Sequence, residues 1–169
     1  MQVPIMYKKN IFDINYDLLV KKGIKCILFD LDNTLVEAKS SEPKKEVIEL
    51  IEKLSKKFKV IIVSNSPNPR LAKLQKHLKV DYYGFSCKPM KRNFKKVIKE
   101  HNFKNEEIVL IGDQFMTDIL GGSRMNIKTI LVDPLSEDLA CTKFNRYLEE
   151  KVINSLSKKN LFFKGKYYE

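Results

Sequence analysis

The sequence predicts an α/β protein built on a mainly parallel sheet with helices on both faces. Short apolar runs rich in β-branched residues alternate with longer segments whose apolar residues recur at helical spacing. The short runs do not alternate between polar and apolar residues, which is typical of strands that are buried on both faces. With 169 residues, 43% of them hydrophobic, the chain can bury a full core.

Each element is predicted from its own pattern. Val47, Ile51, Leu54 and Phe58 form one helical face, and Pro43 suits the first turn of that helix. Strands are predicted at 26–30, 59–65, 81–85 (a short edge strand), 106–113 and 127–134. Helices are predicted at 43–58, 69–78, 93–101, 115–125 and about 139–157. No repeat or break in composition divides the chain, so we expect one domain over residues 1–169. Its core should span about 24–135, between an N-terminal lead-in and a helical C-terminal tail.

The composition disfavours several classes of protein. Cys26, Cys87 and Cys141 are widely spaced and form no CxxC pair, and the only histidines are His77 and His101. This argues against a disulfide framework, a zinc site and a histidine-based nucleophile system. No apolar stretch approaches the ~20 residues of a membrane span, and the start lacks the features of a secretory signal. We therefore expect a cytoplasmic protein.

The formal net charge is +11, so the surface should carry a positive field. Such a field favours anionic partners, among them nucleic acid, anionic lipid and phosphorylated metabolites. The alternative is that the lysine-rich composition does not reflect an anionic binding partner. Charge alone does not decide between the two.

Polar side chains gather where the predicted strands stop. Asp30 and Asp32 end the first strand, Ser64 and Asn65 end the second, and Asp113 ends "VLIGD". Lys88 lies in a loop before a helix. In parallel sheets, sites form at the carboxyl ends of strands. We therefore expect these side chains to meet at one edge of the sheet.

The chemistry of this set suits phosphoryl transfer. Asp30, Asp32 and Asp113 without a histidine or thiolate suit a hard cation, and Mg²⁺ fits best because it accepts carboxylates and substrate phosphate oxygens. Ser64 can donate a hydrogen bond to a phosphoryl oxygen, and Lys88 supplies positive charge. One aspartate can attack phosphorus while its neighbour shuttles the proton. Each fragment alone is an ordinary turn or helix entry; their order in one β/α alternation favours a site.

The strings "DLDNT", "VSN", "CKPM" and "GDQFMTD" resemble, in order, the four motifs of the haloacid dehalogenase-like (HAD) phosphatases. The resemblance implies a Rossmann-like three-layer α/β/α fold. It implies Asp30 as nucleophile and Asp32 as general acid/base. It also implies Ser64, with its neighbour Asn65, as the phosphate ligand and Lys88 as the residue that balances charge.

The same resemblance implies a Mg²⁺ site. Asp30, the backbone carbonyl of Asp32, and Asp113 would hold the ion. Asp118 and Thr34 would support the site. No departure from the family pattern is visible within the catalytic motifs.

A closer likeness runs from about Val3 to Ser157. "SNSPNPR", "KPMKRNF", "IGDQFMTDILGGSRMNIKTILVDPL" and "KFNRYLE", with the lead-in "VPIMYKKNIFDI", resemble the YqeG family of subclass IIIA. Similar proteins include the phosphatases that convert phosphatidylglycerophosphate to phosphatidylglycerol. The resemblance therefore implies an anionic phospholipid as substrate.

The spacing of the motifs predicts a capless, open site. The gaps from Asp32 to Ser64 and from Ser64 to Lys88 hold little more than a helix and a strand each, too little for a cap with its own core. Small-metabolite enzymes usually enclose their ligand, so an open site favours a large or surface-presented substrate. The leading interpretation is a Mg²⁺-dependent phosphomonoesterase acting on phosphatidylglycerophosphate. The alternatives are a phosphatase of a nucleic-acid end or soluble sugar phosphate, and a non-catalytic anion-binding module.

The tail "LSKKNLFFKGKYYE" mixes lysine with aromatic residues. This mixture suits the headgroup region of an anionic membrane, which predicts peripheral association at the inner face of the membrane. The alternative is a frayed terminus, or a tail whose aromatic residues pack on the domain.

Overall fold

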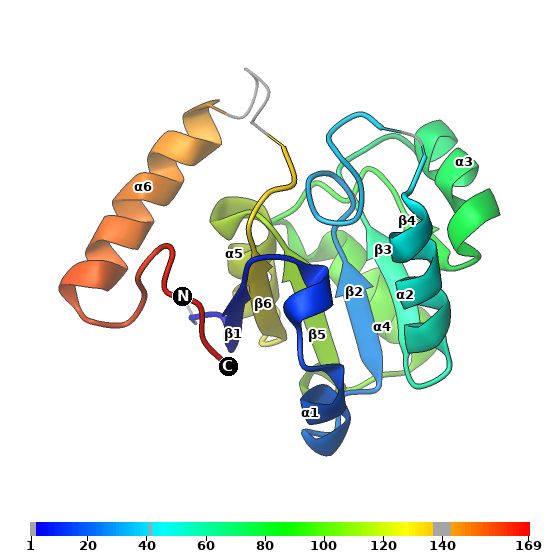
Figure 1. The fold of residues 1–169 in the computed structure, drawn as a ribbon, viewed down its shortest axis with the longest axis horizontal. Helices are drawn as coiled ribbons and strands as arrows, with labels where there is room; N and C mark the ends of the chain where they lie inside the picture. Colours follow the sequence, from blue (N-terminus) through cyan, green and yellow to red (C-terminus); the bar gives the residue numbers. More distant parts are fainter. Residues whose placement is uncertain (1–2, 41, 137–142) are drawn as a thin grey trace.

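Six parallel strands form one sheet in the order β1-β6-β5-β2-β3-β4 (Figure 1). The computed structural model describes residues 3–40, 42–136 and 143–169. The strands are β1 (Met6–Lys8), β2 (Cys26–Phe29), β3 (Lys59–Val63), β4 (Asp81–Tyr83), β5 (Ile108–Gly112) and β6 (Lys128–Val132). In the centre of the sheet, Phe29 of β2 pairs with Ile62 of β3 and Ile111 of β5. The predicted parallel α/β fold is confirmed.

Helices connect and cover the strands. They are α1 (Tyr16–Lys21), α2 (Lys45–Ser55), α3 (Asn68–Leu78), α4 (Lys91–His101), α5 (Leu120–Arg124) and α6 (Lys143–Lys158), with short 3₁₀ turns at Ile11–Asp13 and Asn105–Glu107. None of the helices in the described ranges is long and apolar enough to cross a lipid bilayer. The helices predicted at 43–58, 69–78 and 93–101 are present, with ends that differ by a few residues.

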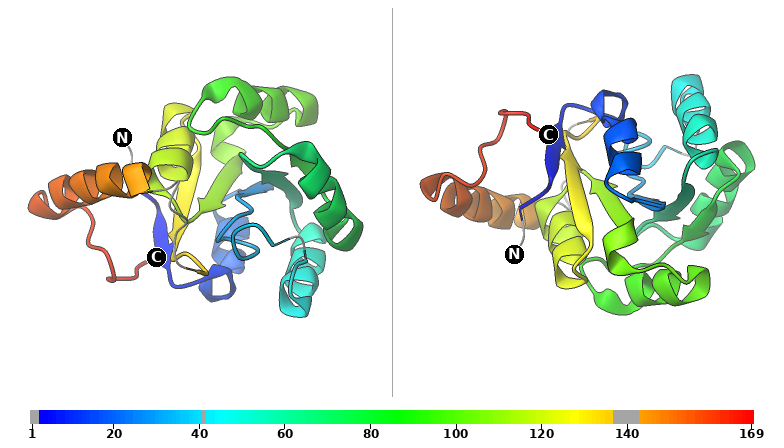
Figure 2. Two further views of the ribbon diagram at one scale, coloured as in Figure 1. Left: turned by 90° about the horizontal axis from the view of Figure 1, so that it is seen from above. Right: turned by 90° about the horizontal axis from the view of Figure 1, so that it is seen from below.

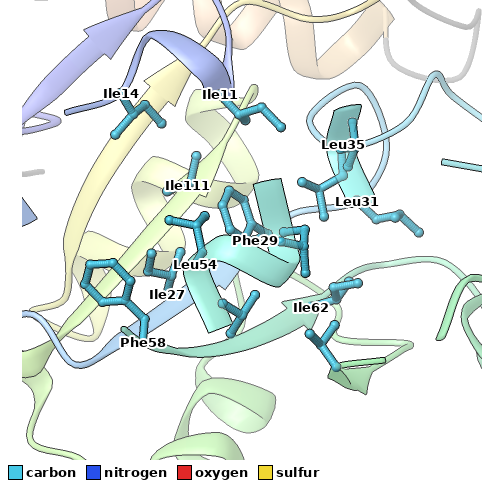
Figure 3. Close-up of a cluster of buried hydrophobic side chains, with 14 of the residues drawn as sticks. Ile11, Ile14, Ile27, Phe29, Leu31, Leu35, Leu54, Phe58, Ile62 and Ile111 are labelled. Atoms are coloured by element: carbon cyan, nitrogen blue, oxygen red, sulfur yellow. The ribbon is translucent and has the colours of Figure 1, made fainter. Parts of the chain in front are cut away.

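The core has a layer on each face of the sheet. Ile27 and Phe29 of β2 pack with Val47, Ile51 and Leu54 of α2, with Leu19 of α1 and with the leucines of α3. Figure 3 shows Ile27, Phe29 and Leu54 in this cluster. Cys26 and Leu28 point the opposite way and pack with Phe94 and Val97 of α4. Figure 2 shows α1 and α2 on one side of the sheet and α4 and α5 on the other. Burial on both faces explains why the strands read as continuous apolar runs.

Three features differ from the sequence prediction. The lead-in forms β1, which pairs with β6, although three residues are too few to show a strand pattern. It also forms α1, for which no helix was predicted. The segment predicted as one helix at 115–125 divides into a π-helical turn, η3 (Phe115–Ile119), followed by α5. The start of the tail helix, predicted near Leu139, and Cys141 lie outside the described residues.

The C-terminal tail returns to the sheet and docks on β1. Tyr7 and Tyr168 form an antiparallel bridge with N–H to O distances of 3.1 and 3.0 Å, so the two ends of the chain lie side by side (Figure 1). Phe162 is 1% exposed and its ring contacts those of Tyr7 and Phe115. For Phe162 and Tyr168 the packing alternative therefore holds, whereas Leu161 and Tyr167 remain about half exposed.

This docking makes Phe162 a part of the core, and its loss should destabilise the protein. Phe162→Ala should lower the free energy of unfolding by about 3–5 kcal/mol, the range for a buried aromatic side chain. Leu161→Ala, a change at the exposed neighbour, should stay within about 0.5 kcal/mol. Urea unfolding of the two variants measures the difference, and equal midpoints would contradict the docked tail.

Candidate active site

The strand order brings the predicted motifs to one edge of the sheet. β2 lies between β5 and β3, so Asp30, directly after β2, stands between Asp113, directly after β5, and Ser64, directly after β3. The ladder continues past the strand ends, because the Asp30 N–H donates to Ile111 O at 2.8 Å and the Ser64 N–H donates to Tyr83 O at 3.0 Å. The site residues therefore sit on rigid backbone.

Lys88 reaches this edge from the loop after β4 and forms the centre of a buried ion cluster. Its ammonium group donates to Asp30 Oδ1 and, at 2.6 Å, to Asp118 Oδ1. The Lys88 side chain is only 2% exposed. Burial alone would lower the pKa of Lys88, but the two carboxylates beside it outweigh burial and raise the pKa. Lys88 is therefore held in its charged form.

Asp30 responds in the opposite sense to the same burial. Burial raises the pKa of Asp30 to about 7, Lys88 opposes the rise, and the Asp118 carboxylate adds to it. The single ammonium group of Lys88 does not supply enough positive charge for all the carboxylates around it. This is the electrostatic signature expected of a site that takes a further cation.

Asp118 reaches Lys88 because Gly112 leaves room for it. A Cβ atom on Gly112 would lie 2.3 Å from Asp118 Cγ, so a larger residue there would displace the Asp118 side chain. The Gln114 N–H and the Thr117 hydroxyl each donate to Asp118 Oδ2 at 3.2 Å. The π-helical turn η3 thus fixes the carboxylate that faces Lys88.

Of the predicted phosphate ligands, Asn65 turns toward the backbone of the Lys88 loop. Asn65 Oδ1 accepts from the Lys88 N–H at 2.8 Å and from the Ser86 hydroxyl at 3.1 Å. Ser64 is buried, and its Oγ accepts from the Ser66 N–H at 3.0 Å. In this arrangement Asn65 positions Lys88, while Ser64 lies beside the central strand.

Asp32 is not one of the carboxylates that contact Lys88. Its carboxylate, 31% exposed, pairs with Arg70 and Ser66 rather than with Lys88. Neither Arg70 nor Ser66 was singled out from the sequence, although both lie within "SNSPNPR". Both residues lie more than thirty positions from Asp32 in the sequence. Helix and strand periodicity do not extend over such a separation, so the pairing becomes visible only in the folded structure.

The segment after Asp32 is fixed by Asn33 and borders a cleft. Asn33 has φ +62° and its Oδ1 accepts from Ser136 Oγ at 2.6 Å. Thr34 is buried, and its hydroxyl oxygen has no hydrogen-bond partner within the part of the chain that the structure describes. Thr34 lines a cleft of about 420 Å³ between the 3₁₀ turn at Ile11–Asp13 and α2. Glu37, Glu42 and Glu46 also line it, so this cleft is a poor place for a phosphate group.

Three carboxylates have the arrangement of a cation site. Oxygens of Asp30, Asp113 and Asp118 lie within 4.8 Å of one another, and all three residues are buried. A donor set made only of carboxylate oxygens suits a hard cation such as Mg²⁺. When all three are ionised, Lys88 leaves two negative charges unbalanced, which a divalent ion would offset. This group consists of side chains and so does not test the predicted role of the Asp32 backbone carbonyl. It includes Asp118, which was predicted only as a supporting residue.

Comparison with known proteins places the chain in a family. Residues 36–126 match the haloacid dehalogenase-like hydrolases, a span that includes Ser64, Lys88 and Asp113 and begins just after Asp30 and Asp32. The chain is 37% identical to "Probable phosphatase YqeG" of Bacillus subtilis over 93% of this chain and 92% of that protein. The chain therefore belongs to the haloacid dehalogenase-like hydrolases, and the resemblance to the YqeG family is confirmed. These matches support a phosphatase.

A more distant relative is named for its substrate. The chain is 26% identical to "Phosphatidylglycerophosphate phosphatase 1, chloroplastic/mitochondrial" of Arabidopsis thaliana over 79% of this chain and 41% of that protein. Among solved structures, the HAD-hydrolase YfnB of Bacillus subtilis, bound to magnesium, matches with a TM-score of 0.57 and 16% identity, over 69% of this chain and 90% of that one. A HAD-like hydrolase from Porphyromonas gingivalis matches with a TM-score of 0.53 and 16% identity, over 75% and 98%. These two likenesses concern the fold.

The carboxylate group predicts measurable Mg²⁺ binding. Mg²⁺ at about 100 times its Kd should raise the free energy of unfolding by about 2.7 kcal/mol, and Asp113→Asn should lose most of this gain. Ca²⁺ should stabilise less, because it prefers more ligands in a looser geometry. Thermal unfolding with EDTA, Mg²⁺ or Ca²⁺ measures the effect. Asp17→Asn, at an exposed carboxylate on α1, is the control, and an unchanged Mg²⁺ titration in Asp113→Asn would exclude the site.

Proposed function

We propose that this protein is a Mg²⁺-dependent phosphomonoesterase that works through an aspartyl-phosphate on Asp30 and dephosphorylates phosphatidylglycerophosphate. The observation that carries the proposal is the buried ammonium group of Lys88 between Asp30 and Asp118, beside three clustered carboxylates. A binding module has no need of such a cluster, because buried carboxylates are costly without a function.

Each residue has a distinct role in the reaction. The Asp30 carboxylate attacks phosphorus, the bond from phosphorus to the leaving oxygen breaks, and Asp32 gives that oxygen its proton. A water molecule then attacks the aspartyl-phosphate, Asp32 takes a proton from that water, and phosphate leaves Asp30. Lys88 and the Ser64 hydroxyl stabilise charge on the phosphoryl oxygens. Mg²⁺, when bound by Asp30, Asp113 and Asp118, supplies further positive charge for the same oxygens.

The surroundings of the site support a substrate that is presented on a surface. The segment from β2 to β3 holds a loop and α2, and the segment from β3 to β4 holds α3. Among the described residues, these two segments contain no further helix or strand from which a cap could be built. The relative from Arabidopsis thaliana, named as a phosphatidylglycerophosphate phosphatase, supports a phospholipid with a terminal phosphate.

A basic and apolar surface borders the site. We call it the Lys88 surface and define it as residues 84–99. Its range contains no acidic residue, and its exposed cations are Lys91, Arg92, Lys95, Lys96 and Lys99. On either side of the buried Lys88, Phe85 and Met90 are 60% and 61% exposed. Exposed apolar side chains among cations suit the headgroup region of an anionic membrane.

The backbone of this surface is held in a costly conformation. Phe85 and Cys87 have φ of +47° and +48°, a region that non-glycine residues rarely adopt. Such strain is found where structure serves a function. The loop with this backbone conformation buries the Lys88 side chain and leaves Phe85 and Met90 on either side of it exposed. The Lys88 surface therefore supports membrane docking more directly than the C-terminal tail, whose Phe162 is buried.

The nucleophile can be tested by substitution. Asp30→Asn should fold normally and lose essentially all turnover, because an amide cannot form the aspartyl-phosphate. Asp32→Asn should retain more activity, with turnover ~10²–10⁴-fold below that of the parent protein. Steady-state hydrolysis of p-nitrophenyl phosphate measures both. Clear turnover by purified Asp30→Asn would remove Asp30 from this role.

The substrate can be tested with a panel and a surface variant. Phosphatidylglycerophosphate in vesicles should be hydrolysed faster than a sugar phosphate, a nucleotide or a 5′-phosphorylated oligonucleotide. The double change Phe85→Ser and Met90→Ser removes side chains worth about 1.5–3 kcal/mol each when fully buried, so binding to anionic vesicles should weaken at least about tenfold. Raised salt should weaken it further by screening.

The control for this experiment is Val20→Ser, because Val20 is 46% exposed on α1, at the opposite edge of the sheet (Figure 1). It should bind vesicles like the parent protein, and both proteins should bind neutral vesicles poorly. Equal vesicle binding by the double variant and the parent would refute docking through this surface. Faster hydrolysis of an oligonucleotide or sugar phosphate would refute the lipid substrate but not the proposed phosphatase activity.

A further inference from the structure

The carboxylate of Asp32 is held by a set of donors that the catalytic motifs do not include. Arg70 Nη1 lies 2.7 Å from Oδ1 and 2.8 Å from Oδ2. The Ser66 hydroxyl donates to Oδ2 at 2.6 Å, and the Lys39 N–H donates to Oδ1 at 3.1 Å. Both oxygens are thus engaged by groups that do not belong to the Lys88 ion cluster. Because the side chain is 31% exposed, these bonds, more than packing, set its orientation.

Arg70 is itself anchored at the other end of its guanidinium group. Nε and Nη2 donate to Ser40 O at 3.0 and 2.6 Å, and Nη1 also donates to Ser66 Oγ at 2.8 Å. The side chain is 15% exposed and starts from the first turn of α3. One planar group therefore joins α3, the end of the β2 segment at Asp32, and the loop that contains Ser40.

We infer that Arg70 is a positioning residue that orients Asp32 for proton transfer; the inference rests on the acid–base role proposed above for Asp32. A guanidinium group can hold Ser40 O and Asp32 at once because its donors form a rigid fork, whereas a lysine offers one ammonium group. Charge-assisted bonds of this length are strong and directional. Arg70 thereby holds the Asp32 carboxylate relative to α3 and to Ser40.

The chemistry explains why orientation matters. As the bond from phosphorus to the leaving oxygen breaks, its electron pair passes to that oxygen, which takes the proton of Asp32. The new negative charge on Asp32 then lies beside Arg70. Proton transfer requires a donor within about 2.6–3.2 Å of its acceptor. Without Arg70, Asp32 can rotate into solvent, and the leaving group must depart with less help.

The test is the dependence of kcat/KM on the leaving group, measured with aryl phosphates whose phenols span a range of acidity. This parameter reports formation of the aspartyl-phosphate. Acidic phenols leave unaided, so Arg70→Ala should lose about 10²-fold with the poorest leaving group, as for weakened general acid catalysis, and only a few-fold with p-nitrophenyl phosphate. Arg70→Lys should recover part of the loss, and Ser66→Ala should show a smaller loss of the same kind.

Lys73→Ala is the matched control, because Lys73 is an exposed cation one turn further along α3. For each protein, log(kcat/KM) is plotted against the pKa of the leaving phenol, and the plot of Lys73→Ala should overlay that of the parent protein. Asp32→Asn measures the full contribution of the acid and should give the steepest plot. A steep plot for Asp32→Asn with parallel plots for Arg70→Ala and the parent would overturn the inference. A parallel plot for Asp32→Asn would instead overturn the acid–base role of Asp32. If Arg70→Ala does not fold, Arg70→Lys and Ser66→Ala decide, and parallel plots for both would overturn the inference.

Discussion

The ion cluster around Lys88 is the constraint on which the rest of the site depends. Its ammonium group, buried between Asp30 and Asp118, links the end of β2, the loop after β4 and the turn η3. A buried charge without a partner costs several kcal/mol, so each of these segments must deliver its group to the same point. Asn65 fixes the backbone of Lys88, and Gly112 clears the space that Asp118 occupies.

The two aspartates of "DLDNT" sit in contrasting environments. Asp30 is buried among carboxylates and the Lys88 ammonium group. Asp32 is partly exposed and held by Arg70 and Ser66. Two like groups placed in unlike surroundings can take different parts in one reaction. The site thus contains two clusters of polar groups, one around Lys88 and one around Asp32. In the proposed mechanism the first carries the charge of phosphoryl transfer and the second orients the proton donor.

Much of this arrangement could be predicted from the sequence, because its signals are local. The apolar runs predicted β2, β3, β5 and β6, and polar residues at their ends predicted the edge where Asp30, Ser64 and Asp113 meet. Contacts between distant segments left no such signal. The three residues of β1 are too few to show a period. The docking of Phe162 depends on Tyr7 near the other end of the chain. Arg70 and Asp32 are brought into contact only by the folding of the chain. Exposure of Phe85 is likewise a property of a loop conformation, which hydrophobic patterning does not predict.

In the proposed mechanism, the phosphoryl group passes through Asp30. Borohydride reduces an acyl phosphate to an alcohol, so an enzyme quenched during turnover and treated with borohydride should contain homoserine in place of one aspartate. Peptide mapping by mass spectrometry locates the altered residue. The aspartyl-phosphate mechanism predicts homoserine at position 30, and only in samples quenched with substrate. Homoserine at position 32, 113 or 118, or at no position in an enzyme that is turning over, would contradict it.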